Sequence, residues 1–177
     1  MRIISLMSIG RVDAALLEPL AEGLTRRLQV ACSIQPDGLE AEFAYNPQRR
    51  QYHSTELLKK ILQKPPGKGW KVLGVTEMDL YIPVLTFVFG EALVANGGAV
   101  VSAHRLHQEF YGMPPDRELL HERLLKEALH ELGHTYGLRH CPDYSCVMSA
   151  SYGVERIDLK RADFCSTCTR LMPSDER

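Results

Sequence analysis

Residues 130–140, HELGHTYGLRH, place three histidines within a short stretch at the end of a predicted helix. His130 and His134 are four positions apart, so a helix projects both rings from one face, where they can bind the same metal ion. A helix that continued further would carry the third histidine away from this pair. Gly137 can adopt a positive φ and end the helix in a tight turn, which returns His140 toward the pair. Three neutral imidazoles with an open fourth position form the ligand set of a catalytic zinc site.

The residue after the first histidine is the glutamate of the pattern H-E-x-x-H. On a helix, Glu131 points to a sector beside that of the histidines, from which its carboxylate can reach a metal-bound water without ligating the metal. This is the position of a general base. The short pattern also arises by chance on charged helices, but a glycine and a third histidine at suitable spacing argue against chance. We therefore expect a metal site with catalytic chemistry.

Four of the five cysteines follow the histidines: Cys141, Cys146, Cys165 and Cys168. Four thiolates are the closed tetrahedral ligand set of structural zinc. A Cys141 thiolate on the histidine site would fill its open position, so we expect two zinc ions, one catalytic and one structural. The second ion would pin the C-terminal segment onto the turn that carries His140. Two disulfides, or a redox pair of Cys165 and Cys168, are the alternatives, and a reducing compartment disfavours them. Cys32 stands alone and is expected to be a small buried residue.

The segment from His130 to Cys168 resembles a known family. Its first part has the extended zinc-binding motif of the metzincin metallopeptidases, and its cysteine-rich continuation is similar to that of the archaemetzincins. The resemblance implies a zincin-like fold and zinc-dependent hydrolysis of peptide bonds, with a peptide or protein as substrate. It also implies that Met148 forms the Met-turn, a hydrophobic floor beneath the histidine site. The substrate is then expected to lie along the edge strand above the active-site helix.

Several other residues are weaker candidates for the site. Some metzincins carry a metal-linked tyrosine two residues after the methionine, whereas Tyr152 is four residues after Met148, so we expect Tyr152 to be a packing or surface residue. Arg49 and Arg50 are candidates for lining a substrate cleft, with a solvated loop as the default interpretation. A solvated position is also expected for the pair His104 and His107, which follow a predicted strand without supporting ligands. Two further histidines belong to no recognisable constellation, namely His53 and His121.

Composition and charge limit the partners and the cellular location that we expect. The 177 residues fit one domain, are 45% hydrophobic and carry a net charge of −1, so nothing indicates a nucleic-acid partner or an anionic membrane surface. The apolar run at the start is brief and is followed by Arg11 and Asp13, which favours a first strand over a signal peptide. The apolar stretch 80–101 is interrupted by proline and polar residues and is not expected to span a membrane. We expect a cytoplasmic monomer.

Apolar periodicity predicts alternating strands and helices. Strands are predicted at 2–9, 31–35, 70–76, 84–90 and 99–105, and helices at 12–29, 55–63, 117–136 and 155–169. This alternation predicts an α/β fold with a twisted, mostly parallel sheet, an antiparallel edge strand and an active-site helix beneath it. The segment 42–54 is interpreted as a polar connection. One metallopeptidase domain is expected over 1–177, with an N-terminal α/β subdomain (1–137) and a small zinc-stapled C-terminal subdomain (138–177).

Three functions remain open at this point. The first is a zinc metallopeptidase in which Glu131 is the general base. Its mode, endopeptidase or aminopeptidase, is undetermined because no acidic residue can be assigned to bind a peptide amino terminus. The second is a non-catalytic, zinc-stabilised module that binds a peptide or protein. The third is a thiol redox protein that uses Cys165 and Cys168.

Overall fold

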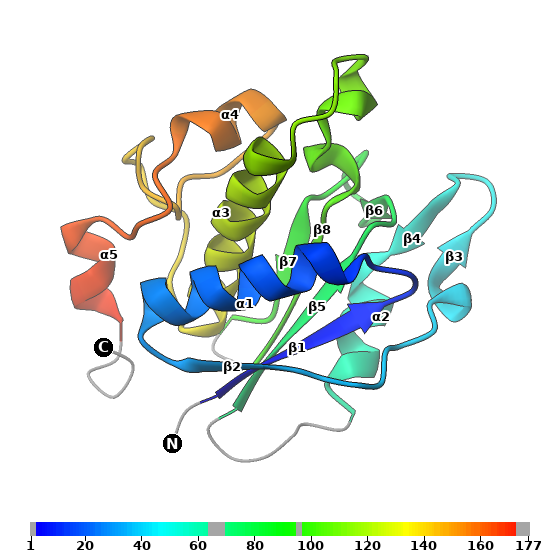
Figure 1. Ribbon diagram of the computed structural model, residues 1–177, viewed down its shortest axis with the longest axis horizontal. Helices are drawn as coiled ribbons and strands as arrows, with labels where there is room; N and C mark the ends of the chain where they lie inside the picture. The colour runs from blue at the N-terminus through cyan, green and yellow to red at the C-terminus, as the bar shows by residue number, and fades with distance from the viewer. Residues whose placement is uncertain (1–2, 64–69, 95–96, 173–177) are drawn as a thin grey trace.

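The main sheet has five strands in the order β2-β1-β5-β8-β7 (Figure 1). The computed structural model describes residues 3–63, 70–94 and 97–172. The strands are β1 (Ile3–Ile9), β2 (Ala31–Ile34), β5 (Trp70–Thr76), β7 (Gly90–Ala92) and β8 (Gly98–Ser102). The first four strands of the order run parallel, and β7 pairs antiparallel with β8 at the edge. The predicted mostly parallel sheet with an antiparallel edge strand is confirmed.

Helices cover both faces of this sheet. The longest elements are α1 (Ala14–Leu28), α2 (Ser54–Ile61) and α3 (Arg117–Thr135). Side chains of α1 and α3 share one core with Leu73 and Val75 of β5, and α2 shares a second core with Val72 on the opposite face. Because the central strands are buried on both sides, their sequences are almost continuously apolar. Both α1 and α3 are preceded by an aspartate N-cap, Asp13 and Asp116, whose side chain accepts a hydrogen bond from a backbone N–H of the first turn.

Two of the three strands of a second, small sheet lie in the segment 42–54, which was interpreted from sequence as a polar connection. Its strands are β3 (Tyr45–Asn46), β4 (Gln51–His53) and β6 (Leu80–Tyr81), with β4 in the centre. Strands of two or three residues are too short for a period-two pattern to stand out, so this sheet was not predicted. A 3₁₀ turn at Glu42–Ala44 (η1) precedes it, and two more, η2 (His104–Leu106) and η3 (Gln108–Tyr111), follow β8.

The predicted strand 84–90 is wrong in most of its length. Pro83 lies in a turn, and the Leu85 N–H donates to the carbonyl of Ile82 at 3.1 Å. Residues 84–89 are irregular apart from one isolated bridge at Val88, and the edge strand begins only at Gly90. The predicted strand 99–105 likewise ends at residue 102, where η2 follows.

The predicted helix 155–169 is two short helices, α4 (Val154–Leu159) and α5 (Ser166–Leu171). The chain between them runs beside residues 145–147. The Arg161 N–H donates to the Ser145 carbonyl, and the Val147 N–H donates to the Asp163 carbonyl. A continuous helix would leave those backbone groups unpaired, because residues 161–163 would then bond within the helix.

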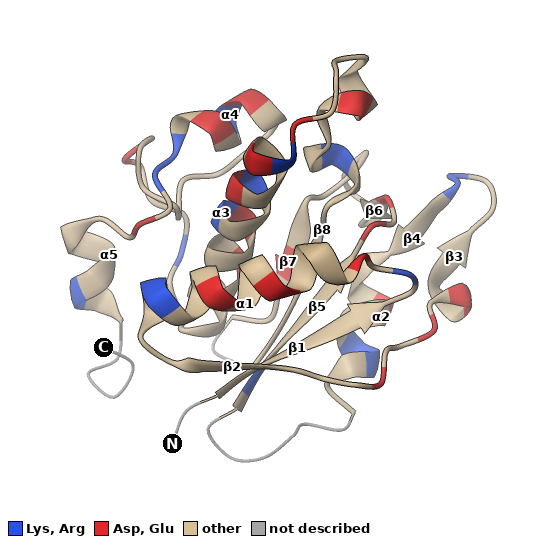
Figure 2. Cartoon of the chain, in the orientation of Figure 1, with Lys and Arg blue, Asp and Glu red and all other residues tan. Residues whose placement is uncertain are grey.

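The C-terminal segment packs into the same core as α3. Val147, Met148, Ile157 and Cys168 are all buried there. The division into subdomains 1–137 and 138–177 stays a prediction. Acidic and basic residues are mixed along α3 and α4 (Figure 2). Over the described ranges, no helix combines the length and apolarity needed to cross a membrane.

Candidate metal centres and active-site cleft

The end of α3 has the geometry that the glycine spacing predicted. Gly137 has φ +89°, and its N–H donates to the carbonyl of His134 at 2.9 Å. The next N–H, that of Leu138, donates to the carbonyl of Gly133 at 3.1 Å. These two bonds form a Schellman motif, which ends the helix and reverses the chain. The turn brings His140 back beside the helix, with its ring centroid 5.2 Å from that of His130.

The three imidazoles converge on one point. Their ligand atoms lie within 4.8 Å of one another, and the Nε2 atoms of His130 and His134 are 3.2 Å apart. The Nδ1 atom of His130 lies 2.8 Å from the Val147 carbonyl, and that of His134 lies 2.8 Å from the Leu138 carbonyl. Since a carbonyl only accepts, both Nδ1 atoms carry the proton and both Nε2 atoms present lone pairs. Two lone pairs that face each other are the arrangement that a shared cation stabilises.

The same surroundings keep the rings neutral. Burial lowers the pKa of His130 well below its usual value, and burial also lowers the pKa of His134 and of His140. The buried ammonium group of Lys160 adds to each shift. Neutral imidazole is the form that binds metal ions, so the three residues are ready to act as ligands at neutral pH.

Met148 packs directly beneath the helix. A Cβ placed on Gly133 would overlap with the Met148 sulfur and would lie 3.0 Å from Cε1 of Phe164. Gly133, the residue before His134, therefore lets the methionine side chain approach α3 closely. Met148 is fully buried, and its carbonyl accepts a hydrogen bond from the Cys141 N–H at 2.9 Å.

The four cysteines form a second cluster next to the first. All four Sγ atoms lie within 4.8 Å of one another, and the pairs Cys141–Cys165 and Cys146–Cys168 are 3.8 Å apart. These separations are far longer than a disulfide bond. Two backbone N–H groups point at the cluster: that of Cys165 toward Cys146 Sγ, and that of Cys168 toward Cys165 Sγ.

One of these thiols ionises readily. The hydrogen bond from the Cys168 N–H lowers the pKa of Cys165 to about 7, whereas burial raises the pKa of Cys168 and of Cys141. A thiolate is the form that binds metal, so the Cys165 sulfur is suited to binding a metal ion near neutral pH. Among the described residues, the three histidines and the four cysteines are the two groups that could hold a metal ion.

A cleft of about 310 Å³ opens beside the histidines. It is lined by 85–90, Glu127, His130, Glu131, His140 and 150–152. Residues 85–90 form one wall, which we call the cleft wall. Both glutamates come from α3, one helical turn apart, and both are buried. Tyr152 also lines the cleft and is 84% exposed, in keeping with its predicted surface position.

Glu131 has an unusual environment. Burial, followed by the neighbouring carboxylates of Glu127 and Glu91, raises its pKa well above the usual value. A Cβ on Gly90 of the edge strand would lie 2.6 Å from Cγ and 2.8 Å from Oε1 of Glu131. The strand therefore approaches the glutamate as closely as only glycine allows, a relation between distant residues that no sequence pattern indicated.

Glu127 is held by a buried ion pair. Its Oε1 lies 3.1 Å from Nζ of Lys160 and 3.4 Å from the Ser151 hydroxyl. Burial raises the pKa of Glu127, whereas Lys160 lowers it. Both side chains are almost inaccessible to solvent, at 1% and 3%. Lys160 thus places one fixed positive charge near the histidines, and sequence reasoning did not find it because its partner is 33 positions away.

The other candidate residues lie elsewhere. Arg49 is half-buried and contacts the back of the cleft wall, while Arg50 is exposed with φ 55°. His53 stacks on Tyr81, with ring centroids 5.1 Å apart. Cys32 on β2 packs against the main core but is only half-buried, so it is less buried than predicted.

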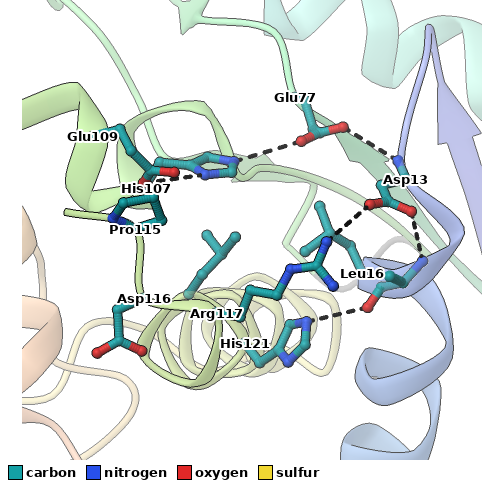
Figure 3. Close-up of a pocket in the computed structure, with 11 residues that line it drawn as sticks. Asp13, Leu16, Glu77, His107, Glu109, Pro115, Asp116, Arg117 and His121 are labelled. Atoms are coloured by element: carbon teal, nitrogen blue, oxygen red, sulfur yellow. Dashed lines mark hydrogen bonds and ion pairs between the residues drawn. The ribbon is translucent and has the colours of Figure 1, made fainter.

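The pair His104 and His107 does not converge. His104 Nδ1 lies 3.2 Å from the Glu77 carbonyl. His107 lies in a separate pocket between the starts of α1 and α3, where its two ring nitrogens point to different carboxylates, Glu77 and Glu109 (Figure 3). Because the two nitrogens of the His107 ring face opposite ways, one metal ion cannot be bound by this ring and by both Glu77 and Glu109. In the same pocket, His121 Nε2 lies 3.1 Å from the Ala15 carbonyl and thereby ties α3 to α1.

Comparisons with known proteins agree with this geometry. The family model described as Peptidase family M54 matches residues 44–174. The chain is 48% identical over 130 residues to the archaemetzincin of Pyrococcus furiosus, which covers 73% of this chain and 68% of the relative. It is 39% identical over 178 residues to that of Thermococcus kodakarensis, covering 97% and 96%. The chain belongs to the archaemetzincins.

Solved structures of the family have the same fold. A zinc-dependent peptidase from Methanocorpusculum labreanum superposes with a TM-score of 0.87 at 34% identity, covering 96% of this chain and 100% of that one. The archaemetzincin of Archaeoglobus fulgidus, in complex with malonate, gives 0.84 at 36% identity, covering 96% and 99%. As an archaemetzincin, the chain is a zinc metallopeptidase, a hydrolase of peptide or protein substrates. The family and the zincin-like α/β fold predicted from sequence are both confirmed.

Proposed function

We propose that this archaemetzincin hydrolyses peptide bonds in the cleft beside α3, with one zinc ion held by His130, His134 and His140 and with Glu131 as general base. A second zinc ion, bound by the four clustered cysteines, has a structural role. The observation that carries the proposal is the convergence of three neutral imidazoles next to a buried glutamate that lines the same cleft; carbonyls fix the Nδ1 protons of His130 and His134.

The ligand separations fit zinc at both clusters. Tetrahedral bonds of about 2.0–2.1 Å to nitrogen place the ligand atoms about 3.3–3.4 Å apart, and the Nε2 atoms of His130 and His134 are 3.2 Å apart. Bonds of about 2.3 Å from zinc to sulfur place the sulfur atoms about 3.8 Å apart. The pairs Cys141–Cys165 and Cys146–Cys168 have this separation. The histidine set leaves a fourth position for substrate and water, whereas the cysteine set is complete.

Different residues of the protein have different roles in the proposed hydrolysis. When bound, zinc supplies a Lewis acid that lowers the pKa of water and polarises the scissile carbonyl. Glu131 accepts the proton of the attacking water and returns it to the leaving nitrogen. Burial raises the pKa of Glu131, which makes its carboxylate a stronger base. Met148 supports the helix from below as the Met-turn residue, and the extended substrate lies along the cleft wall.

The cysteine site would influence the histidine site because residues of the two sites are neighbours along the chain. His140 and Cys141 are consecutive, and Val147, whose carbonyl binds His130, follows Cys146. Closing the sulfur cluster therefore fixes both the third histidine and the partner of the first. The thiol redox alternative is less well supported, because it does not require four sulfurs to converge. A cytoplasmic setting and a monomer stay predictions.

The test is hydrolysis of a diverse peptide library by zinc-loaded protein, read by mass spectrometry. Glu131→Gln keeps the shape of the side chain and removes the base, so we expect hydrolysis to fall by about 10²–10⁴-fold with metal content unchanged. Glu118→Gln, at an exposed position on the same helix, is the matched control and should keep full activity. Metal analysis should give two zinc ions per chain, and one after replacing Cys165 and Cys168 by serine.

Two results would redirect the proposal. Peptide binding without hydrolysis by any variant would favour the non-catalytic binding module. Cleavage that persists in Glu131→Gln would remove this residue from the role of base. Peptides with free and acetylated amino termini, run side by side, separate aminopeptidase from endopeptidase action.

A further inference from the structure

The cleft wall is held in shape by side chains that bind it from behind. Its residues before Gly90 belong to no continuous strand. The Leu85 carbonyl accepts a hydrogen bond from Arg49 Nη2 at 2.6 Å, and the Thr86 carbonyl accepts from the same nitrogen at 3.2 Å and from Gln51 Nε2 at 3.0 Å. A guanidinium and an amide thus replace the strand ladder that this segment lacks.

These contacts continue into a network that ends inside the cleft. Arg49 Nε donates to Gln51 Oε1 at 3.1 Å, and Gln51 Nε2 donates to Asp79 at 3.0 Å. Asp79 accepts two hydrogen bonds from Arg105, at 2.6 and 2.8 Å. The Arg105 guanidinium lies 4.1 Å above the ring of Phe87, which lines the cleft. The network therefore touches the wall at its backbone and at the side chain that a substrate would meet.

Arg49 is the residue that joins these contacts. Its guanidinium also lies 4.2 Å above the ring of Tyr81 in β6, so its orientation is fixed by a second contact. The small sheet presents it: Arg49 turns inward at the β3–β4 turn, while Arg50, with φ 55°, turns outward. The guanidinium is a planar fork with donors on separate nitrogens, so Nε binds the amide oxygen while Nη2 binds two carbonyls, whereas the three donors of a lysine share one nitrogen.

We propose that Arg49 is a positioning residue for substrate, which fixes the cleft wall without touching the metal ligands. This inference rests on the proposed peptidase function. Loss of Arg49 would leave two wall carbonyls without their charged donor and would loosen the surface that a substrate contacts at Leu85 and Phe87. The histidine ligands come from α3 and the turn after it, so they should keep their geometry. The expected signature is a raised KM with little change in kcat, which is a loss of uniform binding.

The experiment compares two hydroxamates on zinc-loaded protein by titration calorimetry. Acetohydroxamate is small and reaches only the metal, whereas the hydroxamate of the peptide Pro-Leu-Gly also reaches the cleft wall. Arg49→Ala should weaken binding of the peptide hydroxamate by about tenfold, the loss expected for one charge-assisted hydrogen bond. Binding of acetohydroxamate should be unchanged. Arg50→Ala removes the same charge from the same turn and should change neither Kd.

Arg49→Lys gives a second reading if the alanine variant folds poorly. It keeps the charge but loses the fork, and we expect a several-fold weaker peptide hydroxamate with acetohydroxamate unchanged. Equal losses for both probes would place the effect at the metal and overturn the inference, as would equal affinities of Arg49→Ala and Arg50→Ala for the peptide probe. Absence of hydrolysis by the unsubstituted protein would overturn the proposed function instead, since the contrast between the hydroxamates does not depend on turnover.

Discussion

Replacing Gly90 by alanine should disable the site while leaving its ligands in place. The new Cβ would lie 2.6 Å from Glu131 Cγ and 2.6 Å from the Val100 carbonyl oxygen, about 0.8 Å short of the 3.4 Å at which ordinary contact begins. The carbonyl belongs to β8 and is fixed in the sheet, so residue 90 must shift away from it, and the Glu131 side chain must also move by most of that distance. A displacement near 1 Å at a catalytic group costs about 10²-fold in rate. Overpacking adds about 1–3 kcal/mol of lost stability.

The assay is kcat/KM on a fluorogenic peptide, with zinc content and thermal unfolding measured on the same samples. Gly23→Ala is the matched control. Its Cβ would meet only the methyl groups of Leu125, at 3.0 and 3.1 Å, where α1 crosses α3, and those side-chain ends can give way. Because alanine favours the helix over glycine, this control should even gain about 1 kcal/mol of folding stability. Wild-type kcat/KM in Gly90→Ala with zinc retained would refute the argument that this glycine makes room for Glu131.

Gly137→Ala forces a Cβ into φ +89° and should cost about 1–2 kcal/mol of stability together with zinc affinity at the histidine site. Gly112→Ala, with φ +75° and open space around it, should lower stability without changing zinc affinity. Equal zinc affinities of the Gly137→Ala and Gly112→Ala variants would contradict the role of Gly137 at the histidine site. Lys160→Met leaves Glu127 buried without its cation and should destabilise the fold by about 3–5 kcal/mol in urea unfolding. Adding Glu127→Gln should recover most of the loss, and no recovery would show that Lys160 stabilises in another way.

The parts of the fold predicted from sequence are those set by local spacing or by burial on both faces. The positions of His130, His134 and Gly137 determine a helix, its end and the return of His140, because each step depends on neighbours within one or two turns. The central strands were predicted because a strand buried on both faces is apolar throughout. The cysteine cluster followed from its ligand chemistry, which is independent of the conformation between ligands.

What sequence could not supply are relations between distant residues. Arg49 acts on carbonyls 36 and 37 positions away, and nothing near it in sequence indicates this. The prediction of a helix at 155–169 was wrong because residues 161–163 form backbone hydrogen bonds with another segment. The prediction of a strand at 84–90 was wrong in most of its length because its apolar residues line a cleft and form no continuous strand. Apolar periodicity reports burial, and a substrate-binding wall and a strand can share the same pattern.

The consecutive placement of His140 and Cys141 has a consequence for biosynthesis. The sheet and α3 leave the ribosome before the last two thiols, and domains generally begin to fold from the N-terminal side during synthesis. A nascent chain can therefore hold His130 and His134 on a folded helix while the turn beyond Gly137 still lacks its anchor. Only when Cys168 emerges can the sulfur cluster close and fix the third imidazole. A hydrolase of peptide bonds would thus complete its active centre only after its sheet and its active-site helix have been synthesised.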